Sequence, residues 1–150
     1  MTSFVFDTGA LSLFYADDER LRPLIDKIHG GGARGLLSSV TLCEFYYKTC
    51  QSLGRDVATL WSRQLGERMQ VVGADLDLSL SAGMEKCRNN RLSLADSYAL
   101  ALSKRVGGIL LTTDSELAKS KESTVRHLSV RIEENNKHQV PHRAGLAELS

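Results

Sequence analysis

The sequence predicts a three-layer α/β/α fold, in which helices cover both faces of a central, mostly parallel sheet of four to five strands. Short apolar segments rich in strand-forming residues alternate with longer segments of helical periodicity. The short segments are apolar throughout, which is typical of strands buried on both faces of a parallel sheet. At 150 residues, 42% hydrophobic and 25% charged, the chain suits one domain with its own core.

The first third of the chain reads as strand, helix and helix. Thr2–Phe6 is a short apolar run and is expected to be a buried strand. Ala10–Tyr15 has helical character, and Pro23 near the start of Arg22–His29 favours a second helix. Gly30–Gly32 is expected to end that helix in a turn.

The middle of the chain contains a second strand and two helices. The strand is expected at Leu36–Val40, and the helix Thr41–Leu53 follows it and ends at Gly54. A further helix is expected at Val57–Arg68, with Leu60, Trp61 and Leu65 on one face. Core packing is also the preferred role for most aromatic residues of this region, with stacking on RNA bases as the alternative.

The last elements repeat the strand–helix alternation. Strands are expected at Met69–Val72, Ile109–Thr112 and Val125–Val130, and helices at Asp75–Cys87, Leu94–Val106 and Ser115–Lys119. Gly107 and Gly108 are expected to end the helix before Ile109. From Arg131 onward the sequence turns polar. We therefore expect residues 1–130 to form the domain and residues 131–150 a C-terminal tail that is peripheral or disordered.

Charge and cysteine content narrow the possible partners and compartment. The formal net charge is +1, so no global field attracts nucleic acid or a membrane surface. The N-terminus lacks the pattern of a signal peptide, and no apolar run approaches the roughly 20 residues that span a bilayer. Cys43, Cys50 and Cys87 lack metal-site spacing and indicate reduced thiols in a cytoplasmic protein. Cys43 and Cys50 are expected to pack in the core.

Four acidic residues lie where a predicted strand meets the start of a predicted helix: Asp7, Glu44, Asp96 and Asp114. Glu44 is expected in the first turn of its helix. In right-handed crossovers the carboxyl ends of parallel strands and the starts of the following helices share one edge of the sheet, so the four carboxylates should meet there. Clustered carboxylates repel each other by roughly 4 kcal/mol per pair at 4 Å with a dielectric constant near 20. A divalent cation would relieve that repulsion, and oxygen ligands suit Mg²⁺ or Mn²⁺.

Helix capping is the alternative role for each acid taken singly. Thr41 with Glu44 and Ser93 with Asp96 have the spacing of capping boxes. Asp7 and Asp114 could each cap the helix after their strand. Capping alone gives no reason for acids on four separate elements to share one edge.

Three segments carry a resemblance to a known family. They are "FVFDTGALS" from Phe4, "TLCEF" from Thr41 and "RLSLADSYALALSKRVGGILLTTDSEL" from Arg91. The third segment is the most specific, because an acid, a helix of small residues, Gly-Gly, an apolar strand and Thr-Thr-Asp occur in order. Between about Ser3 and Leu117 the chain resembles the PIN-domain ribonucleases, most closely the VapC-type toxins of toxin–antitoxin pairs.

The resemblance implies a PIN-like fold and an endoribonuclease that uses one or two Mg²⁺ or Mn²⁺ ions to activate water. Asp7, Glu44 and Asp96 would be the core acids and metal ligands, with Asp114 as the fourth. Thr112 or Thr113 would supply a hydroxyl beside the last acid. A homodimer and an antitoxin protein partner are also implied. Gly9 departs from the family pattern, which often has a larger polar residue or another small residue there.

Four further residues are candidates for a supporting role. Thr8 and Ser97 adjoin two of the acids and could hydrogen-bond to them or to a metal-bound water, with local helix-start bonding as the alternative. Arg88 and Arg91 precede Asp96 and could bind a substrate phosphate, with a solvated loop as the alternative.

Two other kinds of protein remain to be weighed. A phosphoryl-transfer enzyme of the haloacid-dehalogenase kind would need a second aspartate two residues after Asp7, where Gly9 stands. A receiver domain would need adjacent acids at the first strand, and Asp7 has no acidic neighbour in the sequence. A non-catalytic PIN-like module that binds RNA or a protein would have no need to keep four mutually repelling acids. Substitution of Asp7 by Asn would separate a nuclease from such a binder.

Overall fold

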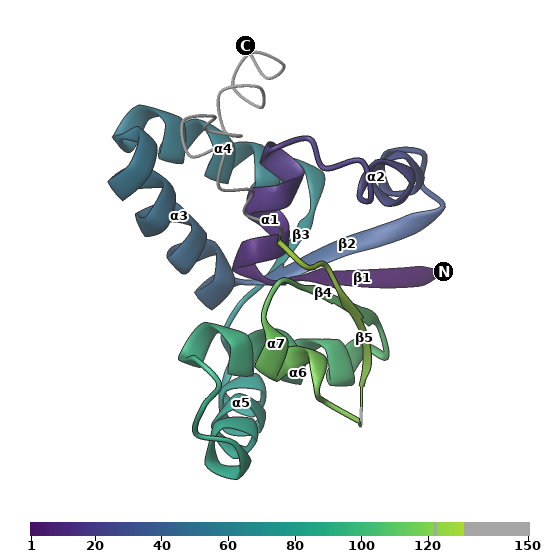
Figure 1. The fold of residues 1–150 in the computed structure, drawn as a ribbon, viewed down its shortest axis with the longest axis vertical. Coiled ribbons are helices and arrows are strands. Elements are labelled where there is room, and N and C mark those ends of the chain that lie inside the picture. The colour runs from purple at the N-terminus through teal and green to yellow at the C-terminus, as the bar shows by residue number, and fades with distance from the viewer. Residues whose placement is uncertain (122, 131–150) are drawn as a thin grey trace.

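The computed structural model describes residues 1–121 and 123–130, and the polar tail expected at residues 131–150 lies outside them. The strands are β1 (Thr2–Phe6), β2 (Ala33–Ser38), β3 (Gln70–Val72), β4 (Ile109–Thr112) and β5 (Thr124–His127). The helices are α1 (Thr8–Tyr15), α2 (Arg22–His29), α3 (Ser39–Leu53), α4 (Arg55–Arg68), α5 (Leu76–Arg88), α6 (Leu94–Val106) and α7 (Ser115–Ala118). The strands form one sheet in the order β3-β2-β1-β4-β5, and every pairing is parallel (Figure 1). The predicted fold class is confirmed.

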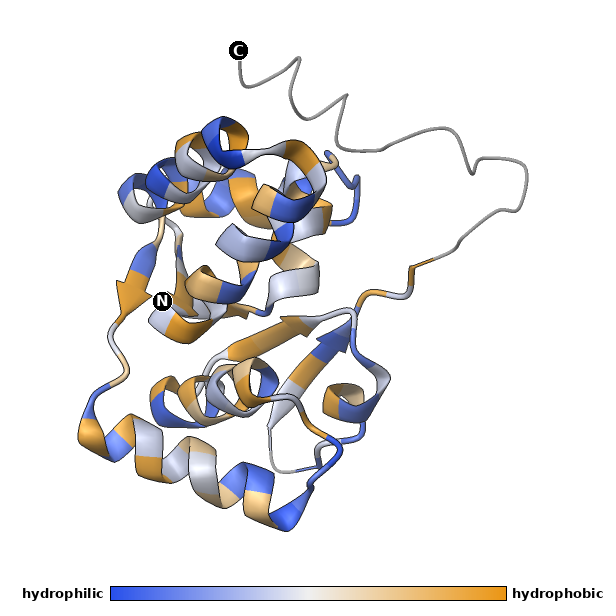
Figure 2. Cartoon of the chain, turned by 90° about the vertical axis from the view of Figure 1, so that its left-hand side faces the viewer, coloured by the Kyte–Doolittle hydropathy of each residue, from blue (hydrophilic) through white to orange (hydrophobic). Residues whose placement is uncertain are grey.

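The sheet separates two hydrophobic clusters. Phe4 and Phe6 of β1 point to the cluster formed with α1, α2, α3 and α4, whereas Val5 between them points to the cluster formed with α5, α6 and α7. Leu37 and Leu36 of β2 divide in the same way. Successive side chains of a strand point to opposite faces, so apolar runs such as these are what a sheet covered on both faces requires (Figure 2).

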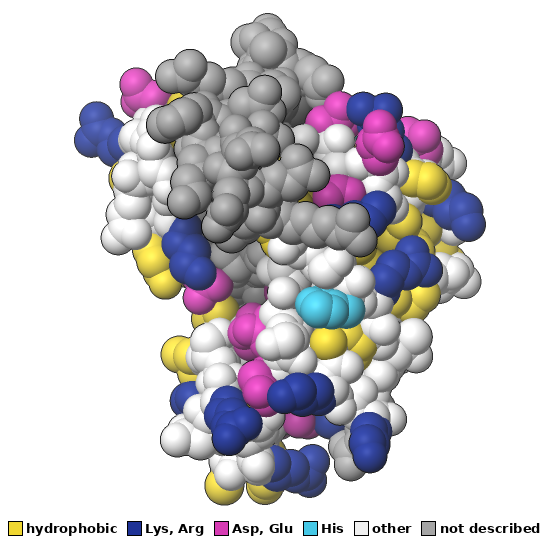
Figure 3. Space-filling view, in the orientation of Figure 1, with side chains coloured by type: hydrophobic (Ala, Val, Ile, Leu, Met, Phe, Trp, Pro, Cys, Tyr) yellow, Lys and Arg dark blue, Asp and Glu magenta, His cyan; other side chains and the backbone are white. Residues whose placement is uncertain are grey.

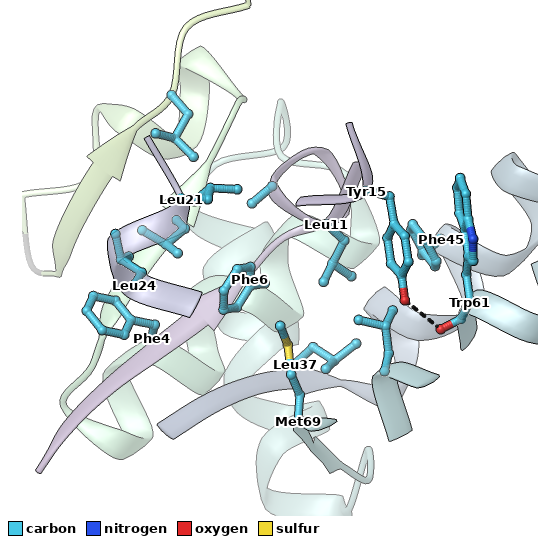
Figure 4. Packing of buried hydrophobic residues seen from close by; sticks show 14 of the residues in the cluster. Phe4, Phe6, Leu11, Tyr15, Leu21, Leu24, Leu37, Phe45, Trp61 and Met69 are labelled. Carbon is cyan, nitrogen blue, oxygen red and sulfur yellow. Dashed lines mark hydrogen bonds between the residues drawn. The ribbon is translucent and has the colours of Figure 1, made fainter. Parts of the chain in front are cut away.

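Three stacked aromatic rings close the core at the far end of α1. The ring of Tyr15 lies 4.3 Å from that of Trp61 and 5.6 Å from that of Phe45, measured between centroids. The Tyr15 hydroxyl donates a hydrogen bond to the Trp61 carbonyl oxygen over 2.9 Å (Figure 4). All three rings are buried, so they pack α1 against α3 and α4 and cannot stack on an RNA base.

The start of α3 differs from the sequence-based expectation. β2 ends at Ser38, whose Oγ accepts a hydrogen bond from the Thr41 amide over 3.0 Å and so caps the helix. The alternative of a capping box formed by Thr41 and Glu44 is therefore wrong, because Ser38, three residues before Thr41, caps the helix. Glu44 consequently lies in the second turn of α3 and not in the first.

Two packing predictions are also wrong. Cys43 is exposed, because α3 buries the face that carries Thr41, Phe45 and Thr49, and Cys43 lies on the opposite side of the helix. Leu60 is 47% exposed, although Trp61 and Leu65 on the same helix are buried as expected.

The strand order places a crevice beside the carboxyl end of β1. The chain passes from β1 to β2 on one side, and later returns to form β4 on the other side of β1. Open parallel sheets bind ligands at such a reversal of strand order. Among the described helices, none combines the length and apolar character needed to span a bilayer.

Candidate functional site

The four predicted acids lie together at the carboxyl edge of the sheet. A pocket of about 300 Å³ is lined by Asp7, Thr8, Gly9, Ser12, Glu44, Lys48, Ser93, Asp96, Thr113 and Asp114. We call it the acidic pocket. Figure 3 shows several acidic side chains close to one another in the lower half of this face of the molecule. One carboxylate each therefore comes from α3, from α6 and from the residues that follow β1 and β4, as the sequence predicted for a parallel sheet.

Asp7 is the most deeply buried of the four, with a relative exposure of 2%. It caps α1, and its Oδ1 accepts a hydrogen bond from the Ala10 amide over 2.7 Å. Its Oδ2 accepts from the Thr112 hydroxyl, and the Thr113 amide also donates to the carboxylate. Burial raises the pKa of Asp7, these hydrogen bonds oppose the shift, and the nearby charge of Asp114 adds to it.

Asp114 caps α7 and is linked to Asp7 through one side chain. The Asp114 Oδ1 accepts from the amides of Glu116 and Leu117 over 2.7 and 3.0 Å. Its own amide donates to the Thr112 Oγ1 over 2.9 Å, while that hydroxyl donates to Asp7. Thr112 thus fixes the relative positions of two acids that are far apart in the sequence.

Asp96 lies in the first turn of α6, where Ser93 caps the helix by accepting from the Asp96 amide over 3.1 Å. Burial raises the pKa of Asp96 to about 7, and the charges of Asp7, Asp114 and, more weakly, Glu44 contribute to the same shift. The Ser93 hydrogen bond opposes it. The influence of the three other carboxylates on Asp96 is an electrostatic sign that all four share one site.

Glu44 completes the acidic pocket from α3. Its Oε1 lies 3.5 Å from the Nζ of Lys48, one helical turn further on. Helix capping and clustering therefore coexist at this site: Asp7 and Asp114 are both caps and neighbours, whereas Glu44 takes no part in capping.

The pocket has the chemistry of a site for a hard divalent cation, because every acid offers oxygen. Thr8 lines it too, is 6% exposed, and its Oγ1 lacks a hydrogen-bond partner in the part of the chain that the structure describes. A buried hydroxyl without a partner is unfavourable unless a ligand or water supplies one. Within residues 1–121 and 123–130, no three His, Cys, Asp or Glu side chains form a ready-made metal cluster. Asp7 is turned toward its capping amides and Thr112, and Glu44 toward Lys48.

The remaining candidates lie in different places. The Ser97 hydroxyl donates to the Ser93 carbonyl oxygen over 2.9 Å and so stabilises the first turn of α6. Arg91 lies 3.8 Å from Glu116, and Arg88 lies 4.0 Å from Glu85. Of the described residues, those lining the pocket include neither arginine nor Ser97.

Sequence reasoning missed Ser12 and Lys48. Each lies one helical turn after a residue that it did select, Ser12 after Thr8 and Lys48 after Glu44, and this spacing was the available signal.

The family model of the PIN domain matches residues 4–122, which include all four acids. The chain belongs to the PIN-domain family. No curated protein matches the sequence.

Solved structures share the PIN-domain fold at low sequence identity. VapBC2 from Rickettsia felis, bound to a promoter DNA fragment, aligns with a TM-score of 0.66 and 11% identity over 85% of this chain and 100% of the other. DNA-bound VapBC from Salmonella typhimurium gives 0.64 and 18% over 85% and 98%. VapC20 from Mycobacterium tuberculosis, a toxin that cleaves the sarcin-ricin loop, gives 0.60 and 15% over 79% and 97%.

Proposed function

We propose that this PIN-domain protein is a Mg²⁺- or Mn²⁺-dependent endoribonuclease and the VapC-type toxin of a toxin–antitoxin pair. The observation that carries the proposal is the convergence of Asp7, Glu44, Asp96 and Asp114, from four elements, on one pocket. The neighbouring solved structures support the biological setting, because they include VapBC complexes and an RNA-cleaving VapC toxin.

Each group in the pocket has a definable task. Asp7, Glu44, Asp96 and Asp114 would hold one or two cations, which when bound supply an activated water as nucleophile and stabilise the leaving oxygen. Thr112 holds Asp7 and Asp114 in register, and the buried Thr8 hydroxyl is placed to bond a ligand. Because Asp96 has a pKa of about 7, it is readily ionised by a nearby cation at neutral pH.

The proposed protein partners are an antitoxin and a second copy of the chain. The exposed apolar side chains of α5, namely Leu76, Leu80 and Met84, follow one another at intervals of four residues and form a stripe on the outside of the helix. A stripe of this kind supports the expectation of a homodimer.

The deciding experiment is cleavage of a labelled single-stranded RNA with Mg²⁺, with Mn²⁺ and with EDTA. Asp96→Asn should abolish cutting, and EDTA should do the same. Asp77→Asn is the matched control, because Asp77 is an exposed acid of α5 outside the pocket. Cleavage that persists in Asp96→Asn or in EDTA would contradict the proposal. RNA binding by a wild-type protein that binds no Mn²⁺ would instead favour the non-catalytic module.

A further inference from the structure

Lys48 is the single basic side chain among the described residues that line the acidic pocket. It extends from α3, its side chain is 58% exposed, and its Nζ lies 3.5 Å from Glu44 Oε1. An exposed pair of this kind within one helix contributes only about 0.3–0.5 kcal/mol. Glu44 therefore restrains Lys48 weakly, and the ammonium group is available to another anion.

Lys48 also lies where the acidic pocket adjoins a second cavity. A smaller cavity of about 70 Å³ lies beside α3, and Ser12, Phe45, Lys48 and Trp61 are among the residues that line it. Ser12 and Lys48 line this cavity as well as the acidic pocket, so the two adjoin where α1 and α3 pack side by side (Figure 1). An RNA strand that leaves the acidic pocket toward this cavity therefore passes Lys48 and Ser12.

A polyanion such as RNA needs a positively charged side chain where Lys48 lies. Four carboxylates oppose the approach of every phosphate, and the net charge of +1 offers no general attraction. A bound divalent cation compensates only the phosphate at the acids themselves. The next phosphate along the strand still faces the acidic pocket and requires a separate positive charge.

We propose that Lys48 is a substrate-binding residue that contacts the phosphate next to the scissile one as a single-stranded RNA crosses the junction of α1 and α3. When Glu44 turns to a cation, the Glu44–Lys48 pair separates and the ammonium group binds the phosphate as a point charge. This role rests on the proposed function. If Lys48 served only as a counter-ion for Glu44, its removal would leave RNA affinity unchanged.

The test compares Lys48→Met, Lys48→Arg and the control Lys119→Met in two binding measurements. Lys119 is a suitable control because it forms a similar exposed pair, 3.0 Å from Glu116 on α7, outside the pocket. Mn²⁺ affinity is measured by titration calorimetry. Affinity for a labelled oligouridylate in Mn²⁺ is measured by fluorescence anisotropy at several salt concentrations, with the intact strand verified by gel.

Lys48→Met should weaken RNA binding by about five- to tenfold, and the slope of log affinity against log salt should fall by about 0.7, the value for one lost phosphate contact to a single strand. Its Mn²⁺ affinity should be unchanged or tighter, since a competing cation has been removed. Lys48→Arg should keep most of the RNA affinity, and Lys119→Met all of it.

Three results would overturn the role of Lys48 or its premise. Unchanged RNA affinity and salt slope in Lys48→Met, while wild type binds Mn²⁺, would overturn the role of Lys48 alone. A parallel loss of Mn²⁺ and RNA binding would show a structural role and overturn it as well. A wild-type protein that binds no Mn²⁺ would overturn the proposed function on which the inference rests.

Discussion

A Cβ atom on Gly9 would lie 1.8 Å from the Oγ1 of Thr113, far closer than two non-bonded atoms can approach. Thr113 thus occupies the space in which a side chain at position 9 would stand, and both residues line the acidic pocket. The glycine that departs from the family pattern is matched by a threonine on the opposite wall. The two positions therefore have to change together.

Gly9→Ala should destabilise the protein by roughly 1–3 kcal/mol, the usual effect of overpacking. The double variant Gly9→Ala with Thr113→Gly should recover most of that stability, since it also removes the Thr113 Cβ and Cγ2, which lie 2.9 and 3.0 Å from the added atom. Thermal unfolding measures both effects. If the two changes were additive, the steric account would be wrong.

A matched pair of double variants distinguishes the effect of side-chain volume at positions 9 and 113 from the effect of a hydroxyl group there. Gly9→Ser with Thr113→Gly returns a hydroxyl to the pocket from the other wall, whereas Gly9→Ala with Thr113→Gly does not. If a hydroxyl here matters to RNA cleavage, only the serine variant should regain activity. Equal activity of the two would show that the space alone matters.

Thr112→Val should weaken both stability and metal binding. The Thr112 hydroxyl donates to buried Asp7 and accepts from the Asp114 amide, so its removal leaves two polar groups unsatisfied, a loss of roughly 1–3 kcal/mol. Thr112→Ser keeps the hydroxyl and is the control. Titration calorimetry with Mn²⁺ and thermal unfolding should place Thr112→Ser near wild type and Thr112→Val well below it on both measures.

Asp96→Asn should stabilise the metal-free protein at neutral pH. The pKa of Asp96 is raised to about 7 from an ordinary 3.8, so the folded state holds its proton more tightly than the unfolded state. Protonated Asp96 therefore stabilises the folded state relative to the ionised form. This contribution to the free energy of unfolding is present in full below pH 4 and is lost as the pH rises through 7. After allowance for partial exposure we expect the asparagine variant to gain roughly 1–2 kcal/mol at pH 7.5.

Thermal unfolding from pH 5 to pH 8 in EDTA checks this prediction. The gap in Tm between Asp96→Asn and wild type should narrow as the pH falls toward 4, and saturating Mg²⁺ should raise the wild-type Tm more than that of the variant. A gap independent of pH would exclude Asp96 as the titrating group.

Substitution on the α5 stripe should affect assembly and leave folding intact. Leu80→Glu with Met84→Glu places two charges on exposed positions, so the free energy of unfolding of the monomer should change by less than about 0.5 kcal/mol. If this stripe forms the homodimer interface, sedimentation should show a monomer for the variant and a dimer for wild type. The control, Leu60→Glu, alters an exposed leucine on α4. A dimeric Leu80 and Met84 variant would place the interface elsewhere.

Much of this architecture was predictable because its signals are local. The apolar run of β4 and the helix α6 have the bounds that the sequence predicts, since Ser93 and Gly107 mark the helix ends without help from tertiary contacts. The meeting of the four acids followed from the parallel sheet alone. Two of them, Asp7 and Asp114, also take the capping role that was the alternative for each.

The errors arose where neighbouring polar residues competed or where packing chose among similar side chains. Ser38 and Thr41 can both cap a helix, and Ser38 takes this role because β2 ends at this residue. Leu60 and Leu65 were expected on one face of α4, but their separation of five residues corresponds to about 140° around a helix, and only Leu65 is buried. The contact of Gly9 with Thr113 joins residues more than a hundred positions apart, and a single sequence carries no signal for such a pairing.

The central position of β1 in the sheet has a consequence during synthesis. Asp7 leaves the ribosome long before β4 emerges, although β4 carries Thr112 beside it and leads to Asp114. Until then β1 lacks one of its two neighbouring strands and the acids have no common pocket. A nascent or truncated chain without β4 therefore lacks the acidic pocket, which forms only when β1 and β4 pair.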